Sequence, residues 1–180
     1  MRNSPVLLAV AAAAILLASV GAQEVLDGAI AAVVNNDVVT FSEVRELVGA
    51  AEKEARGAAQ GQALVEKIKE LRRVATNDLI DRKLILQNAR SEGRTIPDPV
   101  VDDHIEKIIR DSFGGDRAAF LHDLAVRGFN LKLFREHERD SMTVEQMQRE
   151  VVKDATPGTE QKVREEWLRG LRQKAYIKVY

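Results

Sequence analysis

The stretch Ile30-Ala31-Ala32-Val33-Val34-Asn35-Asn36-Asp37-Val38-Val39-Thr40 contains two apolar runs separated by three polar residues. Asn and Asp tolerate the left-handed backbone conformations that tight hairpin turns require. The stretch therefore predicts a β-hairpin. A hairpin by itself is only marginally stable in water, so this one needs a further strand to complete it.

The C-terminal end of the sequence carries the only other clear strand signal. Residues 175–180 read Ala-Tyr-Ile-Lys-Val-Tyr, in which small or aliphatic side chains alternate with aromatic or charged ones. This period of two is typical of a strand. A lone strand would leave its backbone donors and acceptors without strand partners. We therefore expect one small sheet that joins the hairpin to the C-terminal strand.

The sequence between these strands is helical in character. Thr40 followed by Glu43 fits a capping box, which predicts a helix directly after the hairpin. That helix is expected to fray near residues 57–61. The longest helical periodicity follows over residues 64–89, and Gly93 is expected to end it.

Polar and glycine residues mark the next two helices. Asp98 is expected to cap a helix with Pro99 at its first position. Gly114 and Gly115 are expected to break this helix, and Asp116 to cap a short one that runs until Gly128.

Two more helices complete the prediction. Asn130 is expected to open a helix from about Leu131 to Val152, and Thr159 to cap a final helix after the linker around residues 153–159. Short turns between helices favour antiparallel neighbours. The predicted fold class is therefore mainly α: an antiparallel helical domain with a small three-stranded sheet formed by the N-terminal hairpin and the C-terminal strand.

Residues 1–22 predict a signal peptide. Arg2 provides a positive start, residues 6–20 form an apolar run, and Val20-Gly21-Ala22 place small residues where a signal peptidase reads them. We expect cleavage after Ala22 and one mature domain over residues 23–180. An uncleaved membrane anchor is the alternative, although the run is shorter than the roughly 20 residues that a spanning helix needs.

Composition narrows the classes of partner. Removing Arg2 with the signal peptide leaves 26 basic against 28 acidic residues, a net charge of −2. Nucleic-acid binding calls for a basic surface and is not expected. The chain has no Cys, so we expect neither a disulfide nor a lipid attached through cysteine.

The sequence lacks the usual signals of an enzyme. Without Cys and without a G-x-S-x-G elbow, acyl transfer is not expected, and we predict no catalytic residue, cofactor or metal. The three histidines, His104, His122 and His137, lie on separate predicted helices without zinc-ligand spacing. Surface positions are the favoured interpretation, and a zinc site is the alternative.

Large apolar residues are the remaining candidates for function. Most of the eight aromatic side chains should belong to the core. The predicted helix over residues 131–152 has a weak apolar stripe, interrupted by His137 and Ser141, and side chains near it could line a groove. Methionine adapts to many partner shapes. The candidate binding residues are Phe113, Phe129, Phe134, Met142 and Met147.

Several segments in order resemble the SurA family of periplasmic chaperones. Residues 31–44 are similar to the opening hairpin and first helix of that family, and residues 79–98 to its second signature. Residues 101–147 resemble its run of short helices. The closing Trp167, Arg172 and residues 175–179 resemble its C-terminal helix and strand, which in the family return to pair with the hairpin.

The resemblance implies a holdase that needs no ATP or cofactor, is located in the periplasm, and binds unfolded outer-membrane protein segments without stable membrane insertion after signal cleavage. In the family, parvulin-type prolyl isomerase domains lie between the chaperone region and the returning segment. In this sequence only the linker near residues 153–159 separates these two regions, and no parvulin-like Gly-Gly-Asp-Leu-Gly pattern occurs. We therefore expect no isomerase activity.

Two other functions stay open, and so does the oligomeric state. An exported helical adaptor that binds one specific folded partner is the main alternative, and a prolyl isomerase is the least favoured. Because the linker is short, the returning helix and strand could pair with a neighbour's hairpin, which predicts a possible domain-swapped homodimer.

Overall fold

The structure is a computed structural model that describes residues 29–180. The predicted signal peptide of residues 1–22 and its cleavage site lie outside the described residues. The described chain divides into two compact units. Unit 1 comprises Met1–Asp81, described from residue 29, together with Ala175–Tyr180, and unit 2 comprises Arg82–Lys174.

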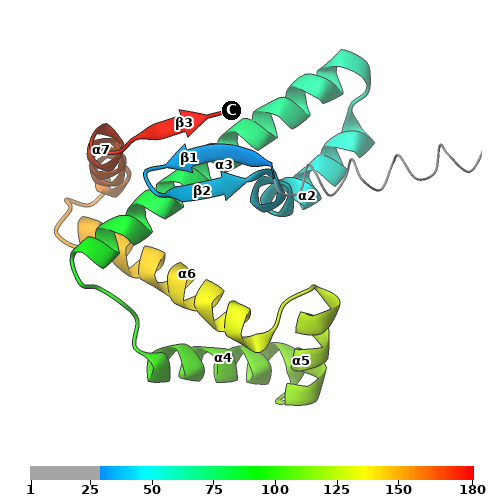
Figure 1. Cartoon of the computed structure of the whole chain (residues 1–180), viewed down its shortest axis with the longest axis vertical. Coiled ribbons are helices and arrows are strands. Elements are labelled where there is room, and N and C mark those ends of the chain that lie inside the picture. Colours follow the sequence, from blue (N-terminus) through cyan, green and yellow to red (C-terminus); the bar gives the residue numbers. More distant parts are fainter. Residues whose placement is uncertain (1–28) are drawn as a thin grey trace, which may run out of the picture. The chain divides into compact units, whose positions relative to one another are not determined.

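Unit 1 contains the predicted three-stranded sheet. Strand β1 (Ile30–Val34) pairs antiparallel with β2 (Asp37–Thr40), and β3 (Ile177–Val179) pairs antiparallel with the other side of β1. The strand order is β2-β1-β3, as Figure 1 shows. Asn35 adopts φ 54° in the turn, which is the left-handed conformation expected there. The hairpin, the C-terminal strand and their pairing are therefore confirmed.

Helix α2 (Phe41–Ala58) begins at the predicted capping box. The Glu43 backbone N–H donates to Thr40 Oγ1 at 3.2 Å, and the Thr40 backbone N–H donates to Glu43 Oε2 at 2.7 Å. These reciprocal bonds satisfy donors that a helix start leaves unpaired. The helix then buries Val44, Val48 and Ala55, at steps of four and seven residues, on one helical face.

Helix α3 (Gly61–Ser91) is one continuous helix that extends through both units, with Asp81 the last residue of unit 1 and Arg82 the first of unit 2. Its buried side chains include Ala75, Ile80 and Ile85, which lie within the predicted helical periodicity of residues 64–89. Gly93 lies just beyond its end with φ 66°, as predicted.

Unit 2 adds four helices: α4 (Asp98–Phe113), α5 (Arg117–Val126), α6 (Leu131–Val152) and α7 (Glu160–Gln173). Gly114 ends α4 in the left-handed conformation, the Asp116 side chain accepts from Ala119 N at 2.9 Å, and the Asn130 side chain accepts from Leu133 N at 2.9 Å. These three predicted boundaries are confirmed. The described part of the chain is mainly helical, as predicted.

The predicted cap at Asp98 is wrong by one residue. Pro97 is the N-cap, and Asp98 is the first helical residue, with Pro99 second. The Asp98 carboxylate forms an ion pair with Arg139 of α6 and makes no capping bond. The carboxylate that the local pattern assigns to the cap thus pairs with a residue distant in sequence.

Thr159 occupies the N-cap position of α7, but its side chain does not cap the helix. Its hydroxyl donates instead to the Thr156 carbonyl oxygen at 2.7 Å. The position of the helix start is confirmed, whereas the predicted capping bond is absent.

Candidate functional site

Unit 2 has a central hydrophobic cluster to which α4, α5 and α6 contribute. Its buried members, called the Phe120 cluster here, are Val101, Ile105, Ile109, Phe120 and Leu124. The first three recur every four residues on one face of α4, which directs them toward the same neighbours. Figure 1 shows α4, α5 and α6 following one another around this region.

Four of the five predicted binding residues pack against this cluster: Phe113, Phe129, Phe134 and Met142. All four are half-buried. The Phe120 ring lies 5.5 Å from that of Phe113 and 5.4 Å from that of Phe134, both in edge-to-face geometry. Such pairs add to the stability gained from burial alone. The core thus fixes the inner side of these aromatic rings while part of their surface stays accessible.

The fifth predicted residue, Met147, lies in a different environment. It is buried with Ile85 and Ala89, and Trp167, Leu168 and Leu171 of α7 pack against this second cluster. A side chain in this position joins α3, α6 and α7. The structure therefore does not bring Met147 together with the other four.

Further exposed apolar side chains occur on the same helices. Val126 at the end of α5 is 72% exposed, Leu133 in the first turn of α6 is 48% exposed, and Leu121 is also exposed. None of the three is among the predicted binding residues, which are all aromatic or methionine. Leu121 directly follows the buried Phe120 and Leu133 directly precedes the half-buried Phe134, so a helical projection would have placed both off the inward face.

Two ion pairs and one histidine–carboxylate hydrogen bond link α4 to α6 around the cluster. Arg135 Nη2 lies 2.6 Å from Asp102 Oδ1, Arg139 pairs with Asp98, and His104 Nε2 lies 3.2 Å from Glu138 Oε2. Each pair joins residues that are far apart in sequence. These contacts connect the two helices that carry Phe113, Phe134 and Met142.

The histidines do not meet at one site. His104 contacts Glu138, whereas His122 lies on α5 and His137 is exposed on α6. Nowhere within residues 29–180 do three or more His, Cys, Asp or Glu side chains gather in a way that could hold a metal ion. None of the helices over those residues is both long enough and apolar enough to cross a membrane.

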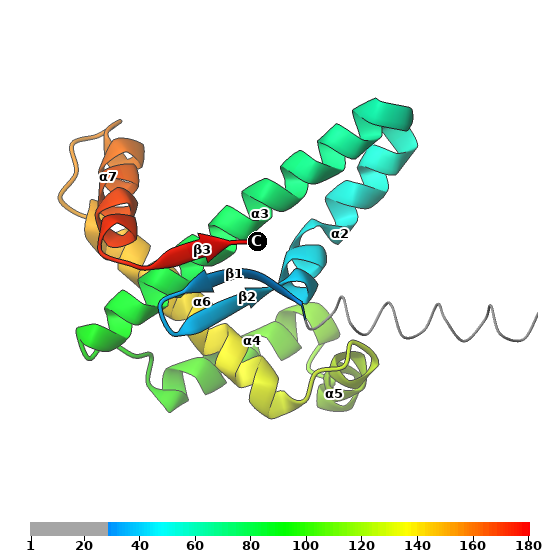
Figure 2. The same ribbon diagram turned by 45° about the horizontal axis from the view of Figure 1, so that its top comes forward.

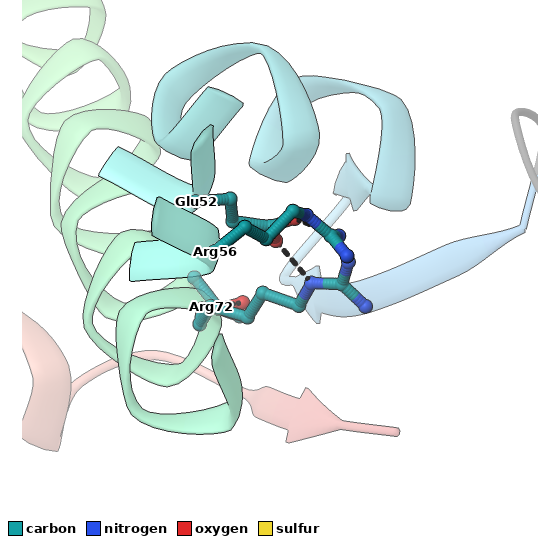
Figure 3. Close-up of polar contacts among 4 residues, drawn as sticks. Glu52, Arg56 and Arg72 are labelled. Atoms are coloured by element: carbon teal, nitrogen blue, oxygen red, sulfur yellow. Dashed lines mark hydrogen bonds and ion pairs between the residues drawn. The ribbon is translucent and has the colours of Figure 1, made fainter. Parts of the chain in front are cut away.

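Unit 1 contains a buried ion-pair cluster that was not predicted from the sequence. Glu52 of α2 is buried, with 8% of its side chain exposed, and it accepts from Arg72 Nε at 2.6 Å and from Arg56 Nη2 at 3.2 Å. Figure 3 shows the three side chains pointing toward one another from α2 and α3. The signal in the sequence is a charged residue within the apolar stripe of Val44, Val48 and Ala55.

The arginines determine the charge state of Glu52. The hydrogen bond from Arg72 is the largest cause that holds the pKa of the Glu52 carboxyl below its usual value, while burial acts in the opposite direction. Glu52 therefore stays ionised at neutral pH. A buried carboxylate with two partners is a structural anchor for both guanidinium groups.

Comparison with known proteins matches most of the chain to a family model. The family model described as the SurA-like N-terminal domain matches residues 1–148. No parvulin domain is found, and no catalytic domain is identified. No curated protein matches the chain in sequence.

Proposed function

The chain belongs to the SurA-like N-terminal domain family, and on this premise we propose that it is an ATP-independent holdase for unfolded outer-membrane proteins in the periplasm, without prolyl isomerase activity. The SurA family is periplasmic, and membership in it implies binding of unfolded protein substrates. The proposed export to the periplasm is based on the predicted signal peptide of residues 1–22, with Ala22 at the cleavage site. Family membership is the observation that carries the proposal.

The half-buried aromatic residues around the Phe120 cluster support a binding role. Phe113, Phe129, Phe134 and Met142 each keep one side on the core and leave another accessible. Apolar contact with a client removes surface from water without any chemical step. A holdase that covers the apolar strands of an unfolded barrel protein also hinders their edge-to-edge pairing. Met147 is buried, so we assign it to the scaffold and not to client contact.

The test dilutes a urea-denatured outer-membrane barrel protein into buffer with an excess of the mature chain and follows light scattering. We expect the chain to suppress aggregation. Leu133→Asp places a charge on α6 at an exposed position and should reduce the protection several-fold. Leu47→Asp is the matched control, because Leu47 is 54% exposed on α2. Unchanged aggregation with the unmodified chain at several-fold excess would refute the proposal.

The adaptor hypothesis has one structural observation in its favour. Strand β3 lies at the edge of the sheet; Val179 within it and Tyr176 and Tyr180 at its two ends are exposed. An open edge can pair with a strand of one folded partner. The range of proteins that the chain binds separates the two functions. In a pull-down experiment, an adaptor would bind no unrelated unfolded chains and would recover one protein at fixed stoichiometry.

The swapped homodimer stays a prediction. Within this chain β3 pairs with its own β1, and residues 153–159 join α6 to α7. Light scattering over a concentration series measures the mass directly. A strictly monomeric mass at every concentration would exclude the swap.

A further inference from the structure

Helices α2 and α3 of unit 1 form an open groove. Its lining residues are Arg56 of α2 and Val65, Ile68, Lys69 and Arg72 of α3. The α3 residues are spaced at i, i+3, i+4 and i+7, so they share one face of that helix. Val65 is exposed, and the groove therefore combines cationic groups with accessible aliphatic surface.

The two arginines are held in place but remain accessible. Their side chains are 58% and 47% exposed for Arg56 and Arg72, while the carboxylate of Glu52 that anchors them is buried. Fixing a guanidinium before a ligand arrives lowers the entropy cost of binding. The outer parts of both guanidinium groups are therefore available to a further anion.

The groove has an excess of positive charge. Arg56, Lys69 and Arg72 contribute three positive charges, and Glu52 neutralises one of them, which leaves a local charge of +2. Among the described residues, Lys69 forms no ion pair. The nearby acidic residue Glu70 pairs with Arg73 at 2.7 Å. This local excess contrasts with the net charge of −1 for the whole chain.

We propose that the α2–α3 groove binds extended polypeptide segments in which an acidic side chain stands beside apolar ones. The inference rests on the proposed function, for which it names a class of client segment. The carboxylate would face Arg56, Lys69 and Arg72, and the apolar side chains would cover Val65 and Ile68. Charge-assisted hydrogen bonds and aliphatic contact then act together at one site.

The test measures binding of a short fluorescein-labelled peptide of valine, phenylalanine and aspartate by fluorescence anisotropy. Lys69→Glu should raise the dissociation constant by about tenfold, since it replaces an attractive charge with a repulsive one. Lys67→Glu is the matched control, because Lys67 is exposed on the same helix but does not line the groove. Replacing aspartate by asparagine in the peptide should weaken binding to the unmodified chain by a similar factor.

Three results would overturn the inference: equal binding of the aspartate and asparagine peptides, equal weakening by Lys67→Glu and Lys69→Glu, or no effect of Lys69→Glu. Vesicles containing phosphatidylglycerol test a membrane as the source of the anion. If Lys69→Glu weakens vesicle binding and leaves peptide binding unchanged, the groove recognises lipid headgroups and the inference is wrong.

The aggregation assay separates this inference from the proposed function. If the unmodified chain suppresses aggregation but the peptide results fail, the holdase stands and the groove is not a client site. If the peptide results hold and aggregation is never suppressed, the groove binds acidic apolar segments and the holdase proposal fails.

Discussion

Unit 1 and unit 2 differ in how their chain segments come together. Unit 2 is one continuous stretch, Arg82–Lys174, whose buried clusters are built from large side chains such as Phe120 and Ile109. Unit 1 requires Ala175–Tyr180 to complete a sheet that begins at Ile30, and its buried strand residues are small or β-branched. Unit 2 therefore depends on side-chain packing, whereas unit 1 depends more on backbone pairing between distant segments.

Removing β3 is expected to have the largest effect on this comparison. Deletion of residues 175–180 leaves one edge of β1 unpaired, and a two-stranded hairpin is marginal in water. We expect amide exchange to show loss of protection throughout β1. The emission of Trp167, the only tryptophan, should not change because its cluster contains no residue of the deleted segment.

Lys178→Ala is the control for that deletion, since it removes a side chain and keeps the backbone pairing with Val33. Protection of β1 should then persist. If β1 stays protected in the deletion variant, the sheet does not depend on its third strand and the contrast between the units fails.

Phe120→Ala tests the packing side of the comparison. Phe120 is fully buried between Phe113 and Phe134, so its truncation should lower the free energy of unfolding by about 3–5 kcal/mol. Urea denaturation followed by Trp167 emission measures it within unit 2. Leu121→Ala, at the exposed neighbouring position, should change stability by less than about 0.5 kcal/mol. Similar losses for the two variants would mean that the aromatic cluster does not dominate the stability of unit 2.

Thr40→Ala should have a smaller effect, confined to the junction of β2 and α2. It removes the hydroxyl that accepts from Glu43 N and should destabilise by about 1 kcal/mol. Thermal unfolding followed by circular dichroism measures the loss. Ser42→Ala is the control, because Ser42 is exposed and outside the capping box. An equal effect of both changes would show that the capping bonds add no stability.

The smallest expected effect is the pH dependence contributed by Glu52. Its pKa is lowered from 4.5 in the folded chain, so its contribution is fully present above that value and is lost as the pH falls through the lowered folded pKa. The stability difference between the unmodified chain and Glu52→Gln should therefore shrink on acidification. Urea denaturation of both proteins at neutral and acidic pH measures this, and other carboxylates cancel in the difference. A difference independent of pH would contradict the role of the two arginines.

Local sequence signals predicted most of the fold. The capping box at Thr40, the turn at Asn35 and the glycines after α3 and α4 act within a few residues, so the sequence contains their full physical cause. Asp98 shows the limit, because its carboxylate pairs with Arg139, a residue 41 positions away. The residues next to Asp98 in the sequence do not reveal that this distant arginine pairs with its carboxylate.

The candidate site was less predictable than the fold. Aromatic and methionine residues near the predicted helix over residues 131–152 indicated Phe113, Phe129, Phe134 and Met142, which pack around one cluster. The same criterion also indicated Met147, because spacing along α6 does not reveal which neighbour covers a side chain. The groove between α2 and α3 depends on Arg56 and Arg72 meeting across two helices, which is a tertiary property.

Asn35 has a consequence for folding kinetics. Its backbone N–H donates to the Tyr176 carbonyl oxygen at 2.8 Å, and its side-chain oxygen accepts from Tyr176 N, also at 2.8 Å, across a separation of 141 positions. Closing so long a loop is entropically costly, so we expect these bonds to form late in folding. Until then β1 has a bare edge and is open to association with other chains. The yield of folded protein therefore depends on whether β3 pairs with β1 before β1 associates with another chain. Only the association depends on protein concentration, so we expect dilution to raise the yield.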